Sequence, residues 1–168
     1  KRLRAMYASE QFAKHNIYPT MAVPKVYAVI AMCLELRDAG LEKEDTLAIV
    51  NDAFRGLKRL FGTFERIIDS TPWAWAVVKK WNMADHDSRV KDGNITFDFF
   101  TSSDDKISYS ICECQYVNMF ASYGIREYCK VFCDSDVQAY ANLTKHVQFI
   151  RHSDLSDGDC CHDEILRK

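Results

Sequence analysis

The sequence predicts an α+β fold in which a helical N-terminal layer packs on a C-terminal antiparallel sheet, with short helices between its strands. Apolar residues recur at helical spacing through residues 23–81, and from Ile95 onward they alternate with polar residues as in strands. No internal repeat or Pro/Gly-rich linker interrupts the 168 residues. We therefore expect a single domain over residues 1–168, with a helical half at 1–90 and a sheet-containing half at 91–168.

Three helices are expected in the first half. The first runs to Gly40 and buries a face made of Val23, Val26, Tyr27, Ile30, Cys33 and Leu34. The second, roughly residues 43–62, carries an apolar stripe made of Leu47, Val50, Phe54, Leu57, Phe61 and Phe64. Ser70, Thr71 and Pro72 form a hydroxyl cap followed by proline, which predicts the start of a third helix. That helix would carry Trp73, Trp75, Val77, Val78 and Trp81.

The second half begins with an antiparallel hairpin. In its first strand Ile95, Phe97 and Phe99 are expected on one side. A polar turn at 102–105 leads to a second strand, in which Ile107, Tyr109 and Ile111 alternate with serines. Helical spacing then predicts one helix ending at Gly124 and another short one at 126–132, followed by strands near 146–152 and 161–166.

Composition favours a globular protein of the cytoplasm. Hydrophobic residues make up 48% of the chain, and 22 Lys and Arg nearly balance 24 Asp and Glu. Without a basic excess, nucleic acid is not an expected partner. The longest apolar runs are far shorter than the ~20 residues needed to cross a bilayer, so no membrane partner is expected either. A small-molecule substrate is the expected partner, and the formation of a homo-oligomer is left open.

The seven cysteines are concentrated near the C-terminus, where all but Cys33 fall within residues 112–161. Three clusters could supply zinc ligands or a redox centre: Cys112-x-Cys114, Cys129-x3-Cys133 and Cys160-Cys161-His162. This spacing differs from the knuckles that usually hold structural zinc, so we expect no metal and no cofactor. A buried free cysteine is also an ordinary core residue, which is the rival interpretation for each thiol.

Two of these clusters combine sulfur with carboxylates and lie at the ends of expected elements. Cys133 and Asp136 fall at the end of a helix, and Cys161 to Asp163 begin the last strand. A thiol beside a base such as His162 could be activated as a nucleophile. Strand alternation, however, puts Cys161 and Asp163 on one face and His162 on the other, where it could lie beside His152 or His146. His15, His86 and His146 are expected at the surface or in local contacts.

The ordered positions Cys114-x-Tyr116, Phe120, Gly124, Cys133-x2-Asp136, Phe149-x-Arg151 and Gly158-x2-Cys161 resemble the L-2-amino-thiazoline-4-carboxylate hydrolase family. The resemblance covers about residues 106–166. It departs from the family where His162, Asp163 and Glu164 replace the usual Asp and aromatic residue after the last cysteine. The resemblance implies water attack on the amidine-like carbon of a 2-amino-thiazoline ring, followed by departure of the ring sulfur.

Such a reaction needs a base or nucleophile, a proton donor and a cation for the substrate carboxylate. We assign the base to Asp136 or Asp163, and the nucleophile or proton donor to Cys133 or Cys161. Arg151 would clamp the carboxylate, with Cys114 and His162 completing the substrate-binding set. Each residue also has a structural explanation, because Arg151 could pair with Asp154 or Glu164 and Asp136 could cap a helix.

A non-catalytic small-molecule binding or sensor domain is the alternative. An aromatic cluster made of Trp73, Trp75, Trp81, Phe97, Phe99 and Phe100 could line an apolar pocket between the helices and the sheet.

Overall fold

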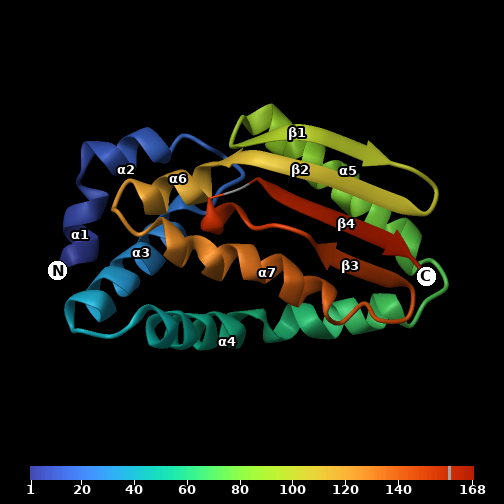
Figure 1. The fold of residues 1–168 in the computed structure, drawn as a ribbon, viewed down its shortest axis with the longest axis horizontal. Coiled ribbons are helices and arrows are strands. Elements are labelled where there is room, and N and C mark those ends of the chain that lie inside the picture. Colours follow the sequence, from blue (N-terminus) through green and yellow to red (C-terminus); the bar gives the residue numbers. More distant parts are fainter. Residues whose placement is uncertain (159) are drawn as a thin grey trace.

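The fold of the protein is α+β, as the sequence predicts, with helices gathered beside and beneath one antiparallel sheet (Figure 1). The computed structural model describes residues 1–158 and 160–168, apart from the side chains of residues 54–62. The expected stripe positions Phe54, Leu57 and Phe61 therefore lie outside the described side chains.

The first helices form a bundle at one end of the sheet (Figure 1). They are α1 (Arg2–Tyr7), α2 (Glu10–His15) and α3 (Val23–Asp38). All of the apolar face predicted for α3 is buried. It packs in one core with α6 (Gln115–Ala121) and the 3-10 helix η1 (Arg126–Cys129). This core packs against the end of the sheet where the cysteine-rich segments lie.

Helix α4 (Lys43–Asp69) is longer than predicted, and the last position of the expected stripe is not buried. Phe64 is 61% exposed, which corrects the expectation that it joins the buried face. The reason is that this end of α4 packs through polar groups. Asn142 bonds both Glu65 and Arg66, while the buried Asp69 carboxylate accepts from the backbone N–H groups of residues 145 and 146.

Helix α5 (Ala74–Asp92) starts later than the predicted cap. The Ser70 and Thr71 hydroxyls donate to carbonyls of Ile67 and Ile68, so they complete the end of α4 and do not cap α5. At its other end, α5 stops at Gly93, whose φ of 67° is the left-handed conformation that favours glycine.

The strands are β1 (Ile95–Ser102), β2 (Lys106–Cys114), β3 (Val147–Arg151) and β4 (Cys161–Arg167). Their order in the sheet is β1-β2-β4-β3, and all neighbours are antiparallel. The predicted alternation along β1 is wrong. Irregular pairing on both sides of Phe97 shifts the register, so Phe97 and Phe100 turn toward the helices while Phe99 contacts His162 on the opposite face.

Helix α7 (Lys130–Tyr140) follows directly on η1, so the short helix expected at 126–132 is in fact much longer. Cys133 and Asp136 consequently lie inside a helix, one turn apart, and not at its end. Helices α5 and α7 both contact the sheet and enclose its inner face.

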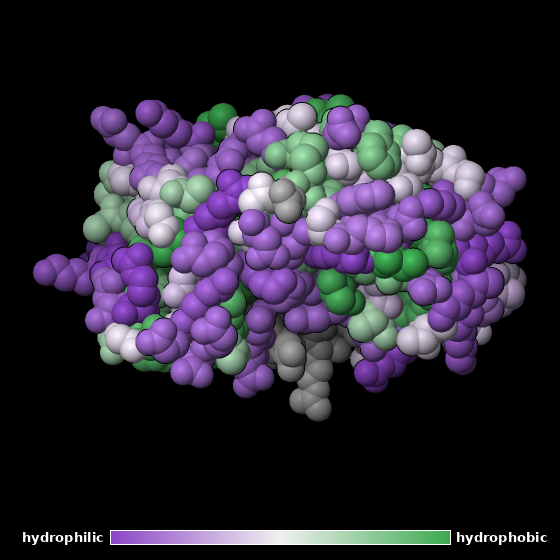
Figure 2. Space-filling view, viewed as in Figure 1, coloured by the Kyte–Doolittle hydropathy of each residue, from purple (hydrophilic) through white to green (hydrophobic). Residues whose placement is uncertain are grey.

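The outer surface of the molecule is mostly hydrophilic on the face shown in Figure 2, with small apolar patches. In the described part of the chain no helix combines the length and apolar character that a bilayer span requires.

Candidate active site

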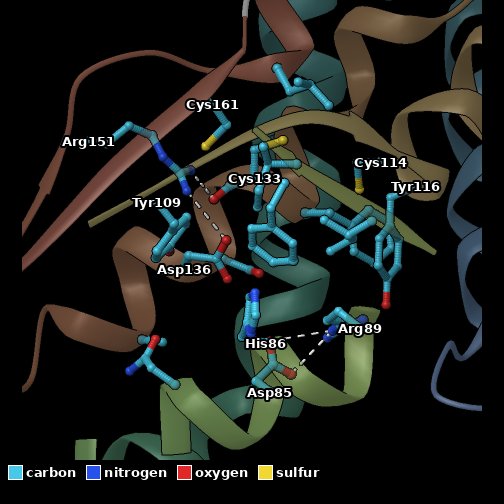
Figure 3. Close-up of a pocket in the computed structure, with 18 of the residues that line it drawn as sticks. Asp85, His86, Arg89, Tyr109, Cys114, Tyr116, Cys133, Asp136, Arg151 and Cys161 are labelled. Carbon is cyan, nitrogen blue, oxygen red and sulfur yellow. Dashed lines mark hydrogen bonds and ion pairs between the residues drawn. The ribbon is translucent and has the colours of Figure 1, made fainter. Parts of the chain in front are cut away.

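A cavity of about 270 Å³ lies between the inner face of the sheet and helices α5 and α7 (Figure 3). Its walls come from α5, β1, β2, α6, η1, α7, the end of β3, the 3-10 helix η2 (Leu155–Asp157) and the start of β4. The side chains with reactive or ionisable groups on these walls are Asp85, His86, Arg89, Tyr109, Cys114, Tyr116, Cys129, Cys133, Asp136, Arg151 and Cys161. A partly enclosed hollow with a few convergent polar groups is typical of small-molecule sites.

Arg151 and Asp163 form a buried ion pair at one side of this cavity. Arg151 donates from Nε to Asp163 Oδ1 at 2.8 Å and from Nη2 to Oδ2 at 2.7 Å. Asp163 is 1% exposed and also accepts from the Cys161 thiol, at a sulfur–oxygen distance of 3.4 Å. Arg151 further donates to the carbonyl of Cys133. The pair thus joins β3, β4 and α7 and fixes the wall that carries the thiols.

Asp136 differs from Asp163 in its access to water. Its side chain is 56% exposed, and one of its oxygens lies 3.4 Å from Arg151 Nη2. From the sequence, either Asp136 or Asp163 was expected to act as the base. In the structure, Asp136 lines the cavity and can accept a proton from water there, whereas Asp163 is sealed beneath Arg151.

Several thiols on the cavity wall are held in the protonated form. Burial raises the pKa of Cys114 to about 11, despite backbone hydrogen bonds that oppose the shift. Burial also raises the pKa of Cys161, with the Asp163 charge adding to the effect. Cys129 has a raised pKa first because of its hydrogen bond with Cys133 and then because of burial. These shifts favour thiols that donate protons over thiolates that attack as nucleophiles.

The opposite wall comes from α5, and sequence analysis missed it. Arg89 donates from Nε to both oxygens of Asp85, at 3.2 and 3.4 Å, and Figure 3 shows Arg89 beside His86 and Asp85 beneath it. The ring of His86 stacks on that of Phe100 with centroids 4.0 Å apart. His86 therefore lines the cavity, and it also makes the local contact expected for it, with Asp87 at 3.1 Å. The signal in the sequence was the polar stripe Asn82, Asp85, His86 and Arg89, whose spacing places all of its members on one helix face.

Only some members of the aromatic cluster expected for the alternative function line the cavity. Trp81, Phe97 and Phe100 line the cavity. Trp73 is 65% exposed, and Trp75 is buried with its indole N–H donating to the carbonyl of Asp104. Tyr109 and Tyr140, which the sequence did not assign to this cluster, also line the cavity.

Comparison with known families agrees with the motif. The family model for L-2-amino-thiazoline-4-carboxylic acid hydrolase matches residues 22–163. The chain belongs to this family. No curated protein and no solved structure matches it. The family match extends well beyond the motif at 106–166 and includes α5, so the Arg89 wall belongs to the shared domain as much as the thiol wall does.

Not every site residue selected from the sequence lines the cavity. Cys114, Cys133, Asp136, Arg151 and Cys161 line it, and Asp163 lies directly behind Arg151 and Cys161. His162 lies on the other face of the sheet, beside His152 with ring centroids 4.9 Å apart, as strand alternation predicts. The structure therefore does not bring His162 to the site, and among the described residues His86 is the histidine that lines the cavity.

A disulfide also lies at this end of the sheet. Cys112 and Cys160, both exposed, are bonded across β2 and the start of β4 with their Cα atoms 4.4 Å apart. The pairing continues the register in which Ile111 faces Cys161. The remaining cysteines are free, and among the described residues no group of three or more His, Cys, Asp or Glu is arranged to hold a metal ion.

Proposed function

We propose that the protein is a hydrolase that opens a cyclic amidine of the 2-amino-thiazoline-4-carboxylate type. The observation that carries this proposal is the meeting of a water-accessible carboxylate, Asp136, with several thiols in one cavity of a chain that belongs to this family. The substrate carbon that reacts is bonded to two nitrogens and a sulfur, and it would sit against α7.

In the proposed reaction Asp136 takes a proton from water as the water oxygen bonds to the amidine carbon. The bond between that carbon and the ring sulfur then breaks, and the sulfur leaves with a proton from a neighbouring donor. One water is consumed and the product is N-carbamoyl-cysteine. Cys133 is our choice for the donor because it lines the cavity one helical turn from Asp136.

Arg151 and Asp163 have a positioning role in this proposal. Arg151 ties the backbone of Cys133 to Asp163, and Asp163 holds the thiol of Cys161. This support keeps the helix turn that carries Cys133 and Asp136 at a fixed distance from the strand. Precise support of this kind matters because small displacements of catalytic groups cost large factors in rate.

The first experiment measures conversion of 2-amino-thiazoline-4-carboxylate to N-carbamoyl-cysteine by mass spectrometry. We expect Asp136→Asn to lower kcat by about 10²-fold or more, as is typical for loss of a general base. Asp134→Asn is the matched control, because Asp134 lies on the same helix but pairs with Lys130 and does not line the cavity. Absence of turnover by the native protein on a panel of cyclic amidines would overturn the proposal, as would full activity of Asp136→Asn.

A non-catalytic binding function is the second candidate, favoured by the aromatic rings of Phe97, Phe100 and His86 on one wall. It predicts that a cyclic amidine raises the melting temperature of the protein and is recovered unchanged after prolonged incubation. The cytoplasmic location and the single domain remain predictions from the sequence, and the formation of a homo-oligomer stays open.

A further inference from the structure

We propose that Arg89, on the α5 wall, is the anchor for the carboxylate of the ligand, and that Arg151 is not. This inference rests on the proposed function for the identity of the ring, and it adds the direction in which the ring enters. The acid group would point toward α5 and the reacting carbon toward α7.

Arg151 is already committed to protein groups. Its hydrogen bonds go to both oxygens of Asp163, to the carbonyl of Cys133 and to Asp136, which uses four of its five N–H groups. A ligand carboxylate placed there would also lie next to two protein carboxylates. Like charges at such short range disfavour one another, so this position is a poor anion site.

Arg89 lines the cavity and has an unused donor. Its Nε edge pairs with Asp85, but Nη1 is buried and has no hydrogen-bond partner among the described residues. A buried guanidinium N–H without an acceptor is rare in folded proteins and is commonly satisfied by a ligand or by water. A carboxylate is the acceptor that best fits the planar fork of arginine.

The surroundings keep Arg89 charged. Burial alone would lower the pKa of Arg89, but the Asp85 charge and the Tyr116 phenol outweigh it and the net shift is upward. Asp85 is 52% exposed and takes only the Nε edge of Arg89, which itself lines the cavity. Figure 3 shows Tyr116 directed at the guanidinium from α6, with Asp136 on a different wall.

This arrangement separates two anions that must both be present. Asp136 needs to remain an effective base, which a carboxylate bound beside it would disturb. With the ligand acid at Arg89, the ring spans the cavity between a cationic wall and a carboxylate wall. The cavity would therefore select heterocycles that carry an acid group over the same heterocycles without one.

The test compares ring compounds with and without a carboxylate. In calorimetry we expect the native protein to bind thiazolidine-4-carboxylate at least about 10-fold more tightly than thiazolidine, because a hydrogen-bonded charge pair commonly contributes a factor of this size. Arg89→Met should lose that preference, and Arg89→Lys, which keeps the charge and is suited to the same helix, should keep part of it. Arg66→Met is the matched control, since Arg66 is exposed on α4 and outside the cavity.

Turnover gives an independent measurement. We expect Arg89→Met to raise KM for 2-amino-thiazoline-4-carboxylate by about 10-fold or more, while kcat/KM for 2-amino-thiazoline, which has no acid group, stays within about 2-fold. Equal binding of both thiazolidines by the native protein, or an unchanged acid preference in both Arg89 variants, would overturn the assignment. If no cyclic amidine is hydrolysed but the acid preference depends on Arg89, the proposed reaction fails and the anchor stands.

Discussion

Removing one partner of the buried pair between Arg151 and Asp163 should destabilise the protein strongly, and the size of the effect can be worked out from the structure. Asp163→Asn removes the charge that pairs with the two Arg151 donors at 2.7 and 2.8 Å. Each hydrogen bond to a charged group contributes ~1.5–3 kcal/mol, and breaking a buried pair commonly costs ~3–5 kcal/mol because the partner charge stays buried. We expect the free energy of unfolding to fall by ~3–5 kcal/mol, which lowers Tm by roughly 6–20 °C for a chain of this size.

Urea unfolding followed by circular dichroism measures this change. The companion variants are Arg151→Met and the double variant Arg151→Met/Asp163→Asn, which complete a double-mutant cycle. The double variant should lose less stability than the sum of the losses in the two single variants. Both charges are absent from it, so no unpaired charge stays buried. Asp136→Asn is the control and should change stability by under ~1 kcal/mol, because the Asp136 side chain is 56% exposed. A loss below ~1 kcal/mol for Asp163→Asn, or strictly additive losses, would refute this account of the pair.

Three further outcomes follow from the structure. The disulfide between Cys112 and Cys160 spans 48 positions, so Cys112→Ser/Cys160→Ser should lower the free energy of unfolding by up to ~4 kcal/mol, and thiol titration of the unreduced, denatured protein should find five free cysteines. More than five reactive thiols would contradict the bond. Burial raises the pKa of Cys114 from 9.0 to about 11, so its protonated form contributes stability below pH 9 that is lost as pH rises through about 11; Cys114→Ala should flatten that alkaline decline in urea unfolding. Gly93→Ala should cost ~1 kcal/mol, because φ is 67° there although a Cβ would contact nothing within 4 Å; an unchanged unfolding midpoint would rule out the proposed conformational cost.

The fold class could be predicted because the two periodicities are clean. The buried face of α3 and the serine alternation in β2 are local patterns, and local patterns suffice to assign helix and strand. The details that failed depend on tertiary contacts. The register shift around Phe97 arises from pairing with β2, and the exposure of Phe64 follows from polar packing of α4 against the segment before β3.

The candidate site was predictable on one wall only. Cys114, Cys133, Asp136 and Arg151 were selected by a motif, and they do line a common cavity. The polar residues of α5 were missed because only the apolar and aromatic spacing of that helix predicts a role for it. The linear sequence does not show whether a polar helix face points to solvent or into a cavity, because that depends on where the sheet packs.

The order of the strands has a consequence for how the protein is made. Strand β4, the last to be synthesised, lies between β2 and β3 and holds both by hydrogen bonds. Until β4 has left the exit tunnel, the hairpin of β1 and β2 can form, but β3 has no partner strand in this sheet and the Arg151 guanidinium has no Asp163 to bind. Both walls of the cavity can therefore be joined only after residues 161–167 leave the exit tunnel, and chains stalled before that point would expose an open sheet edge to chaperones or to one another.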